Sequence, residues 1–244
     1  MQPTAEPETG GRALAPAVAE VATLVFLLLA VSATGILPWA KGFDLDVHSW
    51  LVAHRSSTVV SFAAALTSSA SSAFAVPAVF LAAIALTQGS LWTRLTRAAL
   101  VTGVVGLGML CRFGLSALIA RPRPPEADWA VSASGQSFPS GHTSDAILAA
   151  GVLAWLAAQR LRDRPVLRST LWIIAGTYVV AIAWTRVYLG VHWPTDVIGS
   201  IAFGTAWLCG PLVVRRALLS AGRSWREADV RPRLAAARSR RRHR

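Results

Sequence analysis

The chain has 244 residues, of which 54% are hydrophobic and only 15% are charged, and its formal net charge is +12. Soluble domains carry about 25% charged residues, so this composition argues against a soluble protein and for a membrane protein. Eleven arginines follow Val214 near the C-terminal end. Because no nucleic-acid-binding motif accompanies them, we exclude nucleic acid as a partner and expect this tail to contact anionic lipid headgroups.

Six segments are apolar and close to the length of a membrane helix, which needs about 20 such residues. In chain order they are residues 17–37, 71–87, 98–120, 141–158, 170–188 and 194–214. A shorter apolar stretch, residues 58–66, precedes the second segment, and we expect it to lie at the membrane interface. The predicted fold is therefore all-α, an integral membrane bundle of six transmembrane helices.

The six segments divide the chain into three parts. Residues 1–16 are predicted to be a cytoplasmic N-terminal tail, residues 17–217 a six-helix membrane domain, and residues 218–244 a basic, disordered cytoplasmic tail. The two cysteines, Cys111 and Cys209, lie in apolar stretches and show no metal-ligand spacing, so we interpret them as small buried hydrophobic residues.

The arginines between the segments predict the topology. They follow the second segment, the fourth segment and the sixth, and these three places fall on one side of a six-helix bundle. The arginines of the two connections are Arg94, Arg97, Arg160, Arg162, Arg164 and Arg168. The positive-inside rule makes that side cytoplasmic. We therefore expect a multi-pass protein of the plasma membrane with both termini inside and its remaining loops outside.

Ionisable residues gather at the ends of the segments that face outward. They are Arg121, Arg123, His142, Arg186, His192 and Asp196. Such residues at the rim of a membrane bundle are candidates for a functional site. The sequence therefore predicts an active site at the outer face, with its motifs within residues 112–196.

His192 and Asp196 are four residues apart at the start of the sixth segment. On a helix this spacing places the two side chains on one face. The carboxylate can accept the proton of one ring nitrogen, which leaves the other nitrogen available for nucleophilic attack. Pro194 suits a first helical turn, so we place His192 directly before the helix.

Ser140, Gly141 and His142 lie where the fourth segment begins. Free backbone N–H groups at the start of a helix bind anions, and His142 is placed to donate a proton to a leaving alkoxide. Arg123 and Arg186 can complement the charge of a phosphoryl group with their planar guanidinium groups. Arg121 either assists them or fixes the loop against lipid headgroups.

These residues resemble the motifs of the type-2 phosphatidic acid phosphatase superfamily. The family pattern is a Lys seven residues before Arg-Pro, then Pro-Ser-Gly-His, then Ser-Arg followed after five residues by His and after three more by Asp. The second motif is complete as residues 139–142 and the third has the full spacing, with Thr185 in place of Ser. The first keeps Arg123-Pro124. The resemblance covers roughly residues 98–214.

The resemblance implies a role for each matching residue. His192 is implied to be the nucleophile that forms a phosphohistidine, Asp196 to orient it and His142 to be the general acid. The phosphate is implied to be held by Arg123, Ser140, Gly141 and Arg186. No metal or other cofactor is implied. The expected activity is metal-independent hydrolysis of a lipid phosphate or diphosphate, such as phosphatidate, phosphatidylglycerol phosphate or a polyprenyl diphosphate.

The chain departs from the family pattern at the lysine, whose position holds Ser116. A serine supplies a hydrogen bond but no positive charge. Arg112 lies four residues earlier, on the same face of the predicted helix. Two interpretations stay open: Arg112 partly replaces the lysine, or it pairs elsewhere and the phosphate site is weaker.

Three other functions are compatible with parts of this pattern. A phosphotransferase would pass the phosphoryl group to an alcohol instead of water. A transporter of anionic lipids would also line a cavity with charge, but it would not need the geometry of His142, His192 and Asp196. A member of the family that has lost activity is the third, because of Ser116. The sequence does not indicate the oligomeric state or which lipid is used, and we expect that choice to depend on the groove between the helices and on the loop of residues 126–137.

Overall fold

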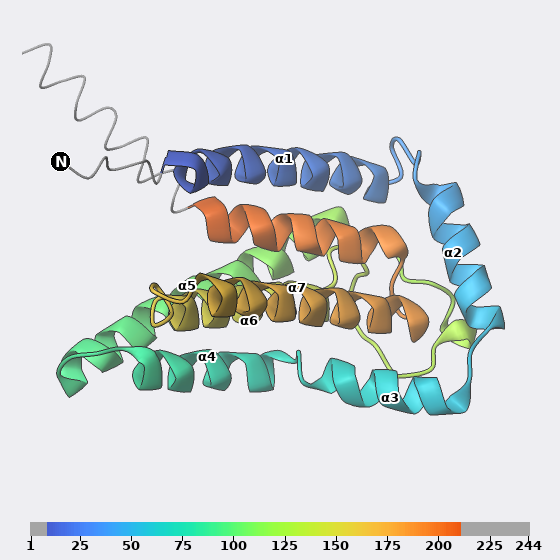
Figure 1. Ribbon diagram of the computed structural model, residues 1–244. Helices are drawn as coiled ribbons and strands as arrows, with labels where there is room; N and C mark the ends of the chain where they lie inside the picture. The colour runs from blue at the N-terminus through green and yellow to red at the C-terminus, as the bar shows by residue number, and fades with distance from the viewer. Residues whose placement is uncertain (1–8, 211–244) are drawn as a thin grey trace, which may run out of the picture.

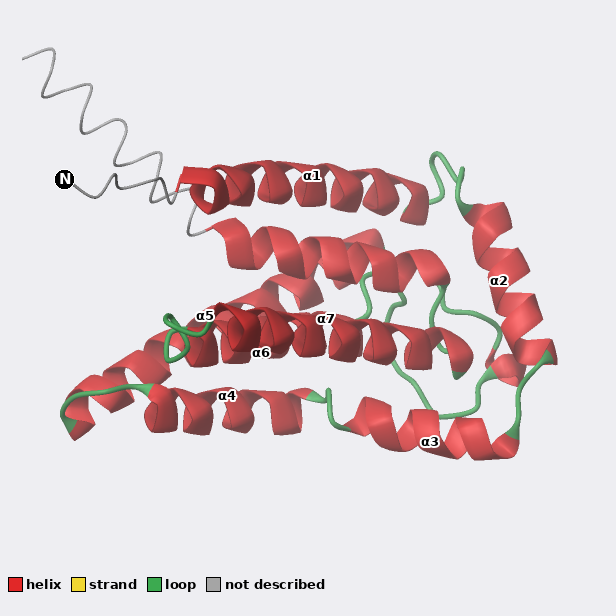
Figure 2. Cartoon of the chain, viewed as in Figure 1, coloured by secondary structure: helices red, strands yellow, loops and turns green. Residues whose placement is uncertain are grey.

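The computed structural model describes residues 9–210 of the chain, and the basic tail and the first eight residues of the predicted N-terminal tail lie outside this range. Within it, Figure 2 shows only helices, turns and loops, and no strand. The helices are α1 (Thr9–Ala33), α2 (Lys41–Ala53), α3 (Ser57–Ser68), α4 (Ser72–Leu86), α5 (Leu91–Ile119), the short 3-10 helix η1 (Glu126–Asp128), α6 (Gly141–Ala158) and α7 (Pro165–Tyr188). A further helix occupies residues 194–210. The prediction of an all-helical protein is confirmed for the described residues.

Helix α6 is the central helix of the bundle, because it packs against α4, α5 and α7. Val79 of α4, Val105 of α5 and Leu148 of α6 belong to one core cluster and are fully buried. Close van der Waals packing on several sides of α6 stabilises this arrangement, because lipid chains are as apolar as these side chains and burial alone gives no gain. The central position of α6 places its first residues in the middle of one end of the bundle.

Within residues 9–210, three helices are long and apolar enough to cross a membrane: Ala15–Ala33, Leu91–Ile119 and Pro165–Tyr188. A fourth span results if α3 and α4 are counted as one, with a bend of 48° between them. Length and composition thus support three or four spans, and the count of six stays a prediction. The interfacial position predicted for residues 58–66 also stays a prediction, although they form part of α3.

Residues 38–70, between the first two predicted spans, contain α2 and α3. Helix α2 has only 13 residues and carries two aspartates and a histidine, so it has neither the length nor the apolar run of a membrane span. That is why a search for apolar segments does not find it. Figure 1 shows α2 lying across one end of the bundle.

The two ends of the bundle differ in what they carry. Figure 1 shows the α1–α2 connection and the long loop before α6 at the end covered by α2, while the α4–α5 and α6–α7 connections lie at the opposite end. At that opposite end Arg94 and Arg160 each donate a hydrogen bond of 2.8 Å from Nε, to the carbonyls of Ile84 and Leu86. The predicted grouping of these arginines at one end, away from the candidate site, therefore holds in the fold.

Candidate active site

His192 lies in the short turn between α7 and the helix of residues 194–210. Gly190 has a φ of +74°, a conformation that residues with side chains rarely adopt, and it allows the chain to reverse direction there. The turn brings His192 against the bundle, where only 1% of the residue is exposed.

Both ring nitrogens of His192 are in contact with a charged partner. Nδ1 lies 3.3 Å from Oδ2 of Asp196, and Nη1 of Arg123 donates to Nε2 over 3.0 Å. This pairing fits the tautomer with its proton on Nδ1, since a carboxylate only accepts and a guanidinium only donates. Burial lowers the pKa of His192 to about 4, although the hydrogen bond with Asp196 opposes that shift. The imidazole is therefore neutral near pH 7, with a lone pair on Nε2.

Asp196 is completely buried and is held from several directions. Its Oδ2 accepts hydrogen bonds from the backbone N–H of Trp193 over 2.8 Å and from the hydroxyl of Ser137. Its Oδ1 accepts from Nη1 of Arg121 over 2.5 Å. Because several donors surround it, the carboxylate stays ionised and keeps a fixed orientation toward His192.

Arg121 connects this carboxylate to a second one on α2. Its Nη2 donates to Oδ2 of Asp44 over 2.6 Å, and the backbone N–H of Thr195 donates to Oδ1 of Asp44 over 2.9 Å. Asp44 is 1% exposed. Arg121 thus fixes its loop to the bundle through two buried carboxylates, Asp44 and Asp196, and not by contact with headgroups alone.

The guanidinium of Arg123 is held by carbonyl oxygens on the side away from His192. Nε donates to Gly135 over 3.0 Å, Nη2 to Ser134 over 2.8 Å, and Nη1 to Val191 over 2.7 Å. Burial lowers the pKa of Arg123, the charge of Asp196 raises it, and the charge of Arg112 lowers it further. Arg123 therefore presents a fixed positive charge directly at Nε2 of His192.

Arg186, near the end of α7, is 4% exposed and extends into the same region. Its Nη1 donates to the hydroxyl of Thr67 over 3.3 Å, and its Nε has no hydrogen-bond partner among the described residues. Its positive charge repels that of Arg123 and disfavours protonation of His192. Two arginines close to one buried histidine can together bind a dianion such as a phosphate.

The start of α6 supplies the third part of the site. Ser140 is the N-cap residue and is fully buried, and its hydroxyl accepts a hydrogen bond of 3.2 Å from Thr143. Its carbonyl accepts from Ser200 over 3.2 Å, which ties α6 to the helix that follows His192. The first backbone N–H groups of α6 have no partners within the helix and are suited to an anion.

His142, the second residue of α6, faces the same cluster. It is near enough to Arg186, His192, Arg123 and Arg112 for their charges to act on it. Asp145, one turn further along, is buried, and its Oδ1 has no hydrogen-bond partner among the described residues.

Arg112 reaches the start of α6 from α5. A methyl group added to Gly141 would lie 3.6 Å from both Cζ and Nη1 of Arg112, which is ordinary van der Waals contact. Ser116 is buried one turn later, and its hydroxyl makes no hydrogen bond with another residue of the range 9–210. The structure thus brings Arg112 against Gly141, one of the residues predicted to bind phosphate.

Residues of α2 and of the turn after it also hold the loop of residues 121–140 in place. Nε2 of His48 lies 3.0 Å from Oδ2 of Asp128. Arg55, just after α2, donates from Nη1 to the carbonyl of Asp128 over 2.5 Å and from Nε to that of Tyr188 over 2.7 Å. These contacts fix the loop relative to the end of α7.

Sequence reasoning missed Asp44, Ser137 and Thr67 as partners of the site. Ser137 was expected only as part of the loop of residues 126–137, and no local motif marks the other two. Asp44 is an acidic residue near the outer end of a membrane helix, and this position only weakly indicates a role in the site. Nothing in the sequence predicts that Thr67 contacts Arg186.

The site can be compared with known proteins at this point. Residues 97–218, half of the chain, match the family model described as the PAP2 superfamily. The chain belongs to the PAP2 superfamily. It is also similar to the crystal structure of a transmembrane PAP2 type phosphatidylglycerolphosphate phosphatase from Bacillus subtilis, with a TM-score of 0.71 and 26% sequence identity. That match covers 81% of this chain and 96% of the other, so this PAP2 chain is a membrane protein of the same fold.

Two curated relatives match shorter parts of the PAP2 chain. Phosphatidylglycerophosphatase B of Bacillus subtilis (strain 168) is 38% identical over 107 residues, which are 41% of this chain and 52% of that protein. The putative undecaprenyl-diphosphatase YbjG of Escherichia coli (strain K12) is 42% identical over 72 residues, or 30% of this chain and 31% of that protein. The matches thus span about half and about a third of these relatives.

Proposed function

We propose that this PAP2 chain hydrolyses the phosphate ester or diphosphate of a membrane lipid through a phosphohistidine at His192. The proposal rests on the two contacts that hold the ring of His192. Nδ1 lies 3.3 Å from Oδ2 of Asp196, and Nε2 lies 3.0 Å from Nη1 of Arg123. A buried neutral imidazole whose lone pair faces a guanidinium is suited to attack a bound phosphorus atom.

In the first step, Nε2 of His192 attacks phosphorus and the bond from phosphorus to the leaving oxygen breaks. His142 donates a proton to that oxygen, which departs as the lipid alcohol or, for a diphosphate, as the lipid monophosphate. The imidazole gains positive charge as the phosphorus–nitrogen bond forms. Asp196 stabilises that charge because its Oδ2 accepts the Nδ1 proton.

In the second step, water attacks the phosphohistidine. His142, now without its proton, accepts one from this water, and the phosphorus–nitrogen bond breaks to release inorganic phosphate. Both histidines return to their starting states. Every proton in this cycle is exchanged by groups of the chain or by water, so no metal ion is required.

The phosphoryl group is held, in this proposal, by Arg123, Arg186 and the first N–H groups of α6 at Ser140 and Gly141. Arg112 supplies the charge that the family lysine provides elsewhere, since its guanidinium lies against Gly141. Guanidinium groups at fixed positions stabilise the charge on the equatorial oxygens of the transition state without reorganising.

The names of the relatives guide the choice of substrate. We infer a phosphatidylglycerol phosphate, a phosphatidate or a polyprenyl diphosphate, since one relative is named a phosphatidylglycerophosphatase and the other a putative undecaprenyl-diphosphatase. We also propose that the site faces the outside of the plasma membrane in a bundle of six spans. The arginines at the opposite end of the bundle support this orientation.

Phosphate release from a panel of lipid phosphates and diphosphates by the purified protein in detergent tests the proposal. We expect release in the presence of a chelator, and a loss of at least about a thousandfold in the His192→Ala variant. The His54→Ala variant is a matched control, because His54 is exposed at the C-terminal end of α2 and stacks on Trp50. Equal release by the parent and the His192→Ala protein would overturn the proposal.

A further inference from the structure

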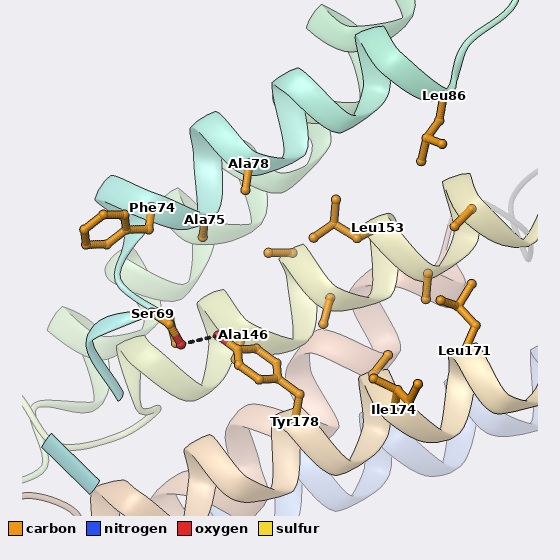
Figure 3. A pocket seen from close by; sticks show the side chains of 16 residues that line it. Ser69, Phe74, Ala75, Ala78, Leu86, Ala146, Leu153, Leu171, Ile174 and Tyr178 are labelled. Atoms are coloured by element: carbon orange, nitrogen blue, oxygen red, sulfur yellow. Dashed lines mark hydrogen bonds between the residues drawn. The ribbon is translucent and has the colours of Figure 1, made fainter. Parts of the chain in front are cut away.

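Helices α4, α6 and α7 enclose an apolar groove of about 540 Å³, shown in Figure 3. Nine of its sixteen lining residues are alanines, and Figure 3 shows α6 between α4 and α7 along its length. The polar side chains among the lining residues are those of Ser69 and Tyr178, whose hydroxyls lie 3.0 Å apart. Its size is within the range of about 300–1,000 Å³ that is usual for ligand sites.

The groove exists because α6 presents small side chains where α4 and α7 diverge. Ala146, Ala150, Ala154 and Ala157 recur at intervals of three and four residues, which places them on one face of the helix. Leucine at these positions would fill the space between the helices. The lining is hydrocarbon, so the occupant that it favours is hydrocarbon as well.

One end of the groove reaches the candidate active site. Ser69 and Ala70 line this end, and Thr67, two residues earlier, accepts the hydrogen bond of 3.3 Å from Arg186. On α6, Ala146 follows His142 by one turn, which is roughly 6 Å along the helix axis. One end of the groove therefore lies close to the cluster of arginines and histidines.

The length of the groove matches the depth of one membrane leaflet. From Ala146 to Ala157 the helix rises roughly 16 Å, and half of the hydrocarbon core of a bilayer is about 15 Å thick. A lipid whose phosphate lies at the active site would have its tail along this direction.

We propose that the groove between α4, α6 and α7 binds one hydrocarbon chain of the lipid phosphate whose headgroup lies at His192. The inference rests on the proposed function, because the phosphate at His192 sets where the chain begins. The groove would then select substrates with long chains, while the arginines recognise only the phosphoryl group.

A kinetic test uses a substitution that fills part of the groove at a position away from the active site. Ala78 of α4 lines the groove and is exposed, whereas Ala85 of the same helix is exposed and does not line it. We expect Ala78→Phe to lower kcat/KM for dioleoyl phosphatidate by about tenfold, because the ring displaces part of the chain. Hydrolysis of p-nitrophenyl phosphate, which has no chain, should stay unchanged and shows that the variant is folded.

Ala85→Phe is the matched control and should leave both activities at the parent level. A second pair, Ala157→Phe in the groove and Ala158→Phe beside it on α6, repeats the comparison at the far end. Full activity of both groove variants on dioleoyl phosphatidate would overturn the proposal.

A binding test distinguishes an error in the proposed lipid-binding groove from an error in the proposed phosphatase activity. The His192→Ala protein, in phosphatidylcholine vesicles, is photolysed with a phosphatidate that carries a diazirine in its acyl chain. We expect labelled peptides from α4, α6 and α7, and loss of the label with excess dioleoyl phosphatidate. Equal labelling by a phosphatidylcholine that carries the same diazirine would indicate bulk lipid in the groove and would overturn the inference, whether or not the parent releases phosphate.

Discussion

Arg121 and Asp44 form a buried ion pair, with Nη2 of Arg121 2.6 Å from Oδ2 of Asp44. The other nitrogen of the same guanidinium donates to Asp196, the residue that contacts His192. A chain of contacts therefore runs from α2 to the ring of His192. It passes through a carboxylate, a guanidinium and a second carboxylate.

The Asp44→Asn variant tests whether this chain of contacts positions His192. The amide keeps the shape but removes the charge, so Arg121 loses one of its two ionic partners and holds Asp196 less firmly. We expect kcat for lipid phosphate to fall by about ten- to a hundredfold, with little change in KM, because the direct phosphate contacts remain. The matched control is Asp46→Asn, two residues along the same helix, where the side chain is exposed. Equal kcat values for the two variants would contradict a positioning role.

The role of Arg112 can be tested by moving the positive charge along α5. We expect Arg112→Ala to lower kcat/KM by about tenfold or more, since one guanidinium beside the phosphate is lost. Adding Ser116→Lys to that variant should restore part of the activity, because it returns the lysine of the family pattern. The control is Arg97→Ala, whose guanidinium lies over the ring of Trp155 at 5.3 Å. An unchanged rate in Arg112→Ala, measured as phosphate release, would show that Arg112 takes no part.

The pH dependence of kcat/KM should report the burial of His192. Its pKa is lowered from 6.5 to about 4, so the neutral ring persists well below pH 6.5 and becomes protonated only as the pH falls toward 4. We expect the acid limb of kcat/KM, corrected for the ionisation of the substrate, to lie near pH 4 and not near pH 6.5. An acid limb at pH 6.5 or above would show that the ring is solvated in the free protein.

The lowered pKa of His192 also predicts that the folding stability depends on pH. Between pH 6.5 and 4 the unfolded chain binds a proton at His192 that the folded chain does not, so folding stability should decrease as the pH falls through this range. Thermal unfolding in detergent, compared between the parent and a His192→Gln variant, measures this part. A parent and variant with the same dependence on pH would contradict burial of a neutral ring.

The proposed orientation in the membrane can be tested with single cysteines. The two natural cysteines, Cys111 and Cys209, are free thiols and would be replaced by alanine. Ser132, in the loop over the site, and Arg162, in the α6–α7 connection, are both exposed. We expect a membrane-impermeant maleimide added to intact cells to label Ser132→Cys and not Arg162→Cys until the cells are opened. The reverse pattern would place the site in the cytoplasm.

Much of the candidate site could be predicted from the sequence because its motifs are local. The spacing of His192 and Asp196 predicts their contact, since residues four apart at the start of a helix are neighbours. The position of Ser140 as an N-cap likewise follows from the chain around it. Arg112 could be proposed from its helix face, and the structure places its guanidinium against Gly141.

The partners that hold those motifs in place could not be predicted in this way. Asp44 is 77 residues from Arg121 in the sequence, and Thr67 is 119 residues from Arg186. Helix α2 is too short and polar to be recognised as a membrane span. It nevertheless carries Asp44, whose carboxylate binds Arg121. No periodicity within one segment encodes such a pairing.

The sequence by itself therefore determined the membrane character, the helical class and the three motifs, because apolar length, helix periodicity and residue type are local properties of the chain. Only the tertiary structure decided that Arg121 lies between Asp44 and Asp196 and that α4, α6 and α7 leave an apolar groove between them. Those features depend on which helices pack together and where their side chains are too small to fill the space, and packing is a property of the whole fold.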